Sequence, residues 1–70
     1  MITNKDIQKA LREAIKTSSM QQKEIAQKLN LHPSAVNKYM CEDTLPALDT
    51  FANLCEILDV SADDILGLKK

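Results

Sequence analysis

The sequence predicts an all-α fold, a compact bundle of five short helices. Apolar residues recur at helical spacing along the whole chain. The 70 residues contain one glycine and two prolines, too few for a turn-rich all-β chain. Thr3 and Ser61 stand directly before two of the helical patterns, and Gly67 directly follows one, as helix start and stop signals do. We therefore expect one all-helical domain over residues 1–70.

The first helix is expected over residues 4–16. Thr3 can cap its start, and Asp6 places a negative charge in the first turn, where the helix dipole favours it. The serine-rich stretch 17–19 ends it. One face forms an apolar stripe, made of Ile7, Ala10, Leu11, Ala14 and Ile15.

The second helix is expected over residues 22–29, with Ile25, Ala26 and Leu29 on one face. Gln21 precedes it where a better capping residue would be serine or threonine. The start of this helix is therefore expected to fray more than the start of the first.

A tight turn at Asn30-Leu31-His32 joins this helix to a third, over residues 33–40. Asparagine tolerates the left-handed conformation that ends a helix sharply, and Leu31 can tuck under the corner. Proline suits the first helical position because its missing N–H has no intrahelical partner there. Three residues of the third helix face inward, namely Val36, Tyr39 and Met40.

The fourth helix is expected over residues 47–58, after Pro46, and the fifth over residues 62–66. Ser61 with Asp64 has the spacing of a capping box, and Val60 with Ile65 that of a hydrophobic staple. The apolar stripes should converge on one core, made of Ile7, Leu11, Ile15, Ile25, Ala26, Leu29, Leu31, Val36, Phe51, Leu54, Cys55, Leu58, Val60 and Ile65.

Two helices joined by a tight turn over residues 22–42 form a helix-turn-helix pattern. The chain resembles the phage repressor and Cro-type (XRE-like) DNA-binding domain of bacterial and phage transcription regulators. The matching positions are Gln22, Ile25, Ala26, Leu29, Leu31, Val36, Tyr39, Pro46, Leu48, Phe51, Leu54, Cys55, Leu58, Val60 and Ser61. The resemblance implies a lambda-repressor-like bundle and a double-stranded DNA-binding transcription regulator, expected to be a repressor, whose third helix enters the major groove.

The charge distribution favours DNA binding more than the net charge of −1 does. Residues 1–41 carry seven basic and three acidic side chains, whereas residues 42–70 carry two basic and seven acidic ones. Because phosphate attraction depends on the local field, the basic half is the half expected to meet DNA.

Two groups of DNA contacts are expected from the motif. The first turn of the third helix and the outward face one turn later should read base edges, through His32, Pro33, Ser34, Asn37 and Lys38. Phosphate contacts are expected from Gln22, by resemblance, and from Lys23 and Thr44. Three of these residues have a plain alternative: His32 as a helix cap with its ring in solvent, Lys38 as an ordinary exposed lysine, and Gln22 as a cap of its own helix.

Three features depart from the family pattern: the turn, the end of the third helix and the loop that follows it. Asn30 replaces the usual turn glycine, which asparagine tolerates. Met40 replaces a glutamate that often pairs with an arginine of the first helix, so Arg12 needs another partner, either Glu42 or DNA. The loop after the third helix carries Glu42 and Asp43, whose carboxylates repel phosphate. The non-specific affinity for DNA is therefore expected to be weaker than that of a relative with a basic loop.

Other function classes find little support. The two cysteines and one histidine cannot supply four zinc ligands, and no catalytic constellation, cofactor motif or phosphate-binding glycine loop is present. The two aromatic residues both look like core, so no stacking platform for single strands or RNA is expected. No apolar run could span a membrane and the start lacks a signal-peptide profile, so a cytoplasmic protein is expected.

Two hypotheses remain open. The first is the DNA-binding regulator, acting as a homodimer at least on DNA because so small a module makes few base contacts. Leu66 and Leu68 are the expected dimer interface, as apolar residues left over near the chain end. The alternative, motivated by the acidic loop and acidic second half, is an antirepressor-like protein-interaction regulator on the same fold, with weak or no DNA binding.

Overall fold

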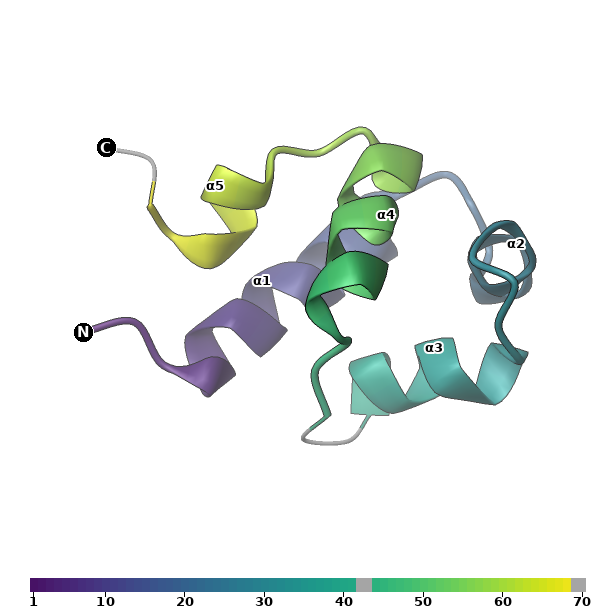
Figure 1. Ribbon diagram of the computed structural model, residues 1–70, viewed down its shortest axis with the longest axis horizontal. Helices are drawn as coiled ribbons and strands as arrows, with labels where there is room; N and C mark the ends of the chain where they lie inside the picture. Colours follow the sequence, from purple (N-terminus) through teal and green to yellow (C-terminus); the bar gives the residue numbers. More distant parts are fainter. Residues whose placement is uncertain (42–43, 69–70) are drawn as a thin grey trace.

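The computed structural model describes residues 1–41 and 44–68, and all the regular structure in these residues is helical (Figure 1). Its helices are α1 (Asn4–Thr17), α2 (Gln22–Lys28), α3 (Pro33–Cys41), α4 (Leu48–Leu58) and α5 (Ala62–Leu66). The predicted fold class and the order of elements are confirmed. The remaining differences are shifts of one residue at helix ends, where helices fray.

The helices divide between two ends of a molecule that measures 32 × 23 × 21 Å. Figure 1 shows α2 and α3 at one end of the longest axis, and α5 with the chain's N-terminus at the other. The long helix α1 packs against both α5 and α3, and α2 packs against α3 and α4. Helix α1 therefore connects the two ends.

The start of α1 is fixed by a reciprocal capping box. The Asp6 backbone N–H donates to the Thr3 hydroxyl oxygen (3.3 Å), and the Thr3 N–H donates to the Asp6 carboxylate (3.0 Å). These bonds from Thr3 favour the ionised carboxylate and lower the pKa of Asp6. The predicted cap at Thr3 is confirmed, and Asp6 contributes to it more directly than through the helix dipole alone.

The other helix starts are weaker. Gln21 makes no side-chain capping bond at α2, as expected of a poor cap. Ser61 occupies the N-cap position of α5, but its hydroxyl accepts no capping bond, so the capping box predicted with Asp64 does not form. Instead the apolar partners hold this corner: Ile65 is buried in the core and Val60 packs against it.

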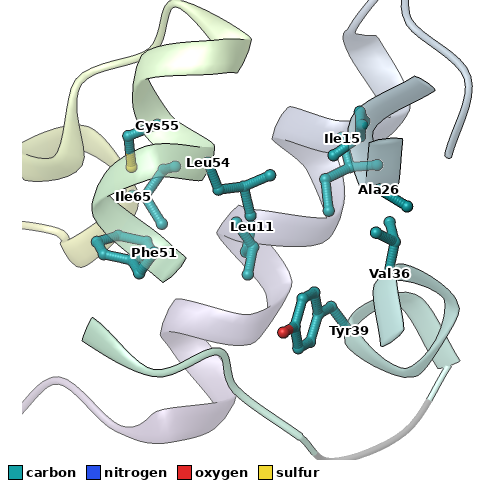
Figure 2. Close-up of a cluster of buried hydrophobic side chains, with 10 residues drawn as sticks. Leu11, Ile15, Ala26, Val36, Tyr39, Phe51, Leu54, Cys55 and Ile65 are labelled. Carbon is teal, nitrogen blue, oxygen red and sulfur yellow. The ribbon is translucent and has the colours of Figure 1, made fainter. Parts of the chain in front are cut away.

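The core is centred on Leu11 of α1, which is fully buried (Figure 2). In this view Leu11 lies between two groups of side chains. One group comes from α4 and α5 and contains Phe51, Leu54, Cys55 and Ile65. The other group lies towards α2 and α3 and contains Ile15 of α1, Ala26 of α2, and Val36 and Tyr39 of α3. Burial of each large member stabilises the fold by about 1.5–3 kcal/mol.

Most of the predicted core is confirmed, with differences of degree. Four expected members are only half-buried and pack against the core, namely Ile7, Leu29, Leu58 and Val60. Leu31 is half-buried outside this cluster and lines an open hollow beside the start of α3, so its prediction as a core residue is wrong. Gln8 is buried without having been predicted, and its side-chain amide reaches the Thr44 carbonyl oxygen at 3.5 Å. This contact ties α1 to the segment that leads into α4.

Candidate nucleic-acid interface

The corner between α2 and α3 is closed by backbone hydrogen bonds. Asn30 adopts the left-handed conformation, with φ of 58°, as the sequence predicted. The Leu31 N–H then donates to the Ala26 carbonyl at 2.8 Å, and the Asn30 N–H donates to the Gln27 carbonyl at 3.1 Å. These bonds satisfy carbonyls at the end of α2 and reverse the chain sharply. Helix α3 is therefore held at a fixed angle to α2.

The start of α3 is capped by a histidine side chain. The Ser34 N–H donates to His32 Nδ1 at 3.1 Å, and the Ser34 hydroxyl lies 2.9 Å from the same nitrogen. Nδ1 is therefore an acceptor, and a neutral ring carries its proton on Nε2. In the structure His32 caps α3, as the alternative interpretation of this residue expected. The exposed Nε2–H nevertheless remains a donor, so capping and DNA contact are compatible in one side chain.

One face of α3 is exposed and polar, whereas the opposite face is buried. Val36 is fully buried and Tyr39 is 9% exposed. The exposed residues follow helical spacing and lie on one surface, made of Pro33, Ser34, Asn37, Lys38 and Cys41. We call this surface the α3 face. Its hydroxyl, amide and ammonium groups match the hydrogen-bonding groups of base edges in the major groove.

The Cys41 thiol on this face lies 3.6 Å from the Asn37 side-chain oxygen, which accepts from it. The Asn37 amide oxygen is thereby occupied by a weak donor, while the amide nitrogen keeps its two N–H groups for other partners. Cys41 was predicted only as a helix-end residue, and its place on the α3 face follows from the extension of α3 by one residue.

Arg12 of α1 donates from Nε to the Tyr39 carbonyl oxygen at 3.4 Å. The interaction brings a cation to the last turn of α3, where the carbonyl groups are favourable partners for it. Of the two partners expected for Arg12, Glu42 lies outside the described residues. The backbone contact was missed because it depends on how α1 and α3 pack. The sequence did indicate that Arg12 needs a different acceptor, because Met40 stands where the family pattern has the glutamate that often pairs with this arginine.

A family model described as "Helix-turn-helix" matches residues 11–65. The chain belongs to the phage repressor and Cro-type helix-turn-helix family. This family consists of DNA-binding transcription regulators. Comparisons with curated proteins and with solved structures find no match.

Gln22 and Lys23, two of the residues predicted to contact phosphate, differ in their exposure at the start of α2. Gln22 is the first residue of α2 and is half-buried, while Lys23 beside it is exposed. Lys23 lines an open hollow between α2 and the start of α3, together with Gln27, Asn30, Leu31 and Pro33. Lys23 thus lies next to the α3 face, whereas Gln22 is not among the residues that line this hollow.

Beyond the helix-turn-helix, Thr44 is half-buried and its carbonyl accepts the bond from Gln8. The predicted repulsion by Glu42 and Asp43 concerns residues outside the described ranges. Phosphate binding by Thr44 remains a prediction.

The two tail leucines of the predicted dimer interface lie in different surroundings. Leu66 packs against the core, while Leu68 is 58% exposed. They therefore do not form one exposed patch, because the core near α5 had room for Leu66. Their part in a dimer remains a prediction.

The two cysteines of the helix-turn-helix domain also differ. Burial raises the pKa of the Cys55 thiol above its usual 9.0, whereas Cys41 is exposed. Within residues 1–41 and 44–68, no three His, Cys, Asp or Glu side chains gather as a metal site would require. No helix among these residues is long and apolar enough to cross a membrane.

Proposed function

We propose that this protein is a sequence-specific double-stranded DNA-binding transcriptional repressor that inserts α3 into the major groove. The observation that carries this proposal is the α3 face, an exposed surface with the polar side chains of Ser34, Asn37 and Lys38 on a helix whose opposite side is buried. The closed corner after α2 and the contact from Arg12 hold this helix rigidly, which supports a reading role.

The five residues predicted to read base edges each suit a particular contact. Lys38 can donate to guanine O6 and N7, and Ser34 can bond to either kind of base edge. Asn37 can bond adenine or a phosphate, and Pro33 can contact a thymine methyl group. His32 directly precedes the α3 face, and the Nε2–H of this exposed side chain can donate to an acceptor at the groove edge. These five residues form the proposed reading surface.

Phosphate contacts are proposed for Gln22, Lys23 and Thr44. Lys23 is the best supported of these, because it is exposed and lines the hollow beside the start of α3. Such contacts orient the protein on the duplex without reading its sequence.

We further propose that two copies bind a two-fold symmetric site. A surface of this size reads few base pairs, and two copies multiply the specificity. Two α3 helices on one side of the duplex require half-sites about 34 Å apart, one turn of the double helix. Binding across a promoter then represses by excluding other proteins from it.

The acidic residues of the second half and the exposed Leu48 and Leu68 favour a second candidate, a protein-interaction regulator on the same fold. The two functions differ in salt dependence. The affinity for DNA falls steeply with the logarithm of salt concentration because counterions are released. Affinity for a partner protein has no such requirement.

Selection of genomic duplex fragments by the purified chain, followed by footprinting, tests the proposal. We expect enrichment of a palindromic site and protection on one side of the duplex. A salt titration on the enriched fragment should then give a steep negative slope. If no duplex is enriched at low salt, the protein-interaction function replaces the proposed one.

A further inference from the structure

An apolar groove lies at the opposite side of the core from the corner between α2 and α3. It runs between the start of α1, the start of α4 and the end of α5, which Figure 1 shows near one another. We call it the Leu48 groove, and it is lined by Asn4, Ile7, Leu45, Pro46, Phe51 and Leu66, with Leu48 at its rim.

Leu48 stands out at this rim with 86% of its surface exposed. It is the first residue of α4, so its position is fixed by the helix rather than by a loose chain end. The exposed large apolar residues of the described chain are Met1, Ile2, Leu48 and Leu68, and none of them lies on α2 or α3. Leaving leucine in water at a helix start has a cost that burial against a partner would remove.

We propose that the Leu48 groove is the interface with a second copy of this chain, and that each copy inserts its Leu48 into the groove of the other. Of the two leucines predicted from the sequence for a dimer interface, this groove includes Leu66 and leaves out Leu68. A protruding side chain beside a hollow of matching chemistry is self-complementary. In a two-fold interface the same patch serves both copies, so residue i meets residue j and j meets i. A two-fold axis close to Leu48 therefore fills both grooves at once.

The charges beside the groove support a second copy as the occupant. Lys5 lines a shallow hollow that shares Asn4 and Leu45 with the groove, so it flanks the α1 wall. Asp49 is exposed and follows Leu48 directly on α4. When one copy's Leu48 enters the other's groove, its Asp49 is carried towards the partner's Lys5, and the symmetry repeats the pair.

The interface is small, so the dimer is weak. A standard interface covers about 800 Å² on each partner, which is roughly a sixth of the 5020 Å² surface of this chain. The groove and its rim amount to less than that. We expect a dissociation constant between about 1 µM and 1 mM for the free protein, and tighter pairing on DNA, which holds two copies adjacent.

The biological role of this dimer rests on the proposed function, but self-association is measured without DNA, so either can fail alone. Sedimentation equilibrium up to about 1 mM protein should show a monomer–dimer equilibrium for the wild type. Leu48→Ser should shift it to monomer. Leu68→Ser is the control: this leucine is also exposed, at 58% against 86% for Leu48, but it does not line the groove, so its replacement should leave the equilibrium unchanged. Both sites are exposed, so both variants should keep the wild-type melting temperature.

A charge exchange adds a second measurement. Lys5→Glu and Asp49→Lys should each weaken self-association by about 3–10-fold, and a mixture of the two variants should pair more tightly than either alone. On DNA, Leu48→Ser should bind a single half-site as the wild type does but lose cooperative binding to two. The proposal is overturned if the wild type is monomeric at every concentration. It is equally overturned if Leu48→Ser still dimerises, or if Leu68→Ser alone dissociates the dimer.

Discussion

The two ends of the molecule share one core but present opposite surfaces. Both pack on Leu11, which in Figure 2 lies between the side chains of α4 and α5 and those of the α2–α3 end. Outside, the α2–α3 end carries polar groups and no exposed large apolar residue within the described ranges. The other end exposes Ile2, Leu48 and Leu68, and the chain's second half carries seven of its ten acidic residues.

This difference separates stability from recognition. The buried side chains at each end are constrained by packing, so their identity tells little about binding partners. The exposed side chains are not constrained by packing, so their chemistry indicates the kind of partner they bind. Hydrogen-bonding groups at one end suit base edges, and apolar side chains at the other suit a protein surface.

The largest effect is expected from Leu11→Ala, which should lower the free energy of unfolding by about 2–5 kcal/mol. Leu11 is fully buried where both ends meet, so hydrogen exchange should accelerate in α3 and α5 alike. Urea denaturation gives the magnitude, and exchange measured by NMR gives the distribution. As a control, Leu48→Ala in the free monomer should change stability by less than about 0.5 kcal/mol. Loss of protection at only one end would mean that the ends are stabilised independently.

The reactivity of the two cysteines tests the contrast between the exposed α3 face and the buried core. A thiol reagent should modify exposed Cys41 quickly, and Cys55 at least about 1,000-fold more slowly, because its modification needs unfolding. The raised pKa of Cys55 means that its stabilising contribution is complete below pH 9.0 and is lost as the pH rises through the higher folded value. Alkylation of Cys41 should weaken DNA binding, since the adduct occupies the α3 face.

Serine variants provide the controls for that experiment. Cys41→Ser should bind DNA with normal affinity and resist inactivation by the reagent, while Cys55→Ser should remain sensitive. Equal labelling rates for the two thiols in the native protein would contradict the burial of Cys55. Undiminished binding after complete labelling of Cys41 would remove this residue from the interface.

The smallest effect concerns the cap at the start of α1, where Thr3 belongs neither to the α3 face nor to the lining of the Leu48 groove. Thr3→Ala should lower stability by about 0.5–2 kcal/mol through loss of the cap. The lowered pKa of Asp6 means that its contribution is present above the ordinary value of 3.8 and is lost as the pH falls through the lower folded value. Thr3→Ala should therefore also flatten the acid limb of the stability profile. Thermal melts between neutral and acidic pH, with Thr17→Ala as the comparison, would show whether it does.

Local features were the most predictable from the sequence. The five helices, the left-handed Asn30 and the polar exposure of Ser34, Asn37 and Lys38 follow from spacing and turn chemistry, which act over a few residues.

Features that need two distant segments were not predictable. The bond from Arg12 to the Tyr39 carbonyl and the burial of Gln8 against Thr44 join positions 27 and 36 residues apart. The division of the tail, with Leu66 packed and Leu68 exposed, depends on how much space α5 leaves beside α1. The exposure of Leu48 was likewise hidden, because its position matches an ordinary apolar site of the family pattern.

The central claim is that the α3 face reads duplex DNA, and base preference tests it most directly. Fluorescence anisotropy should be measured on the selected duplex and on single-base variants, with wild type, Lys38→Ala and Lys28→Ala. Lys28 is the matched control, since it removes the same charge from an exposed position that lines a hollow with residues of α4. We predict that Lys38→Ala loses about 1–3 kcal/mol of binding free energy and relaxes preference at one base pair. Lys28→Ala should keep the preference. If Lys38→Ala and Ser34→Ala both discriminate among the duplexes as the wild type does, α3 is not the reading helix.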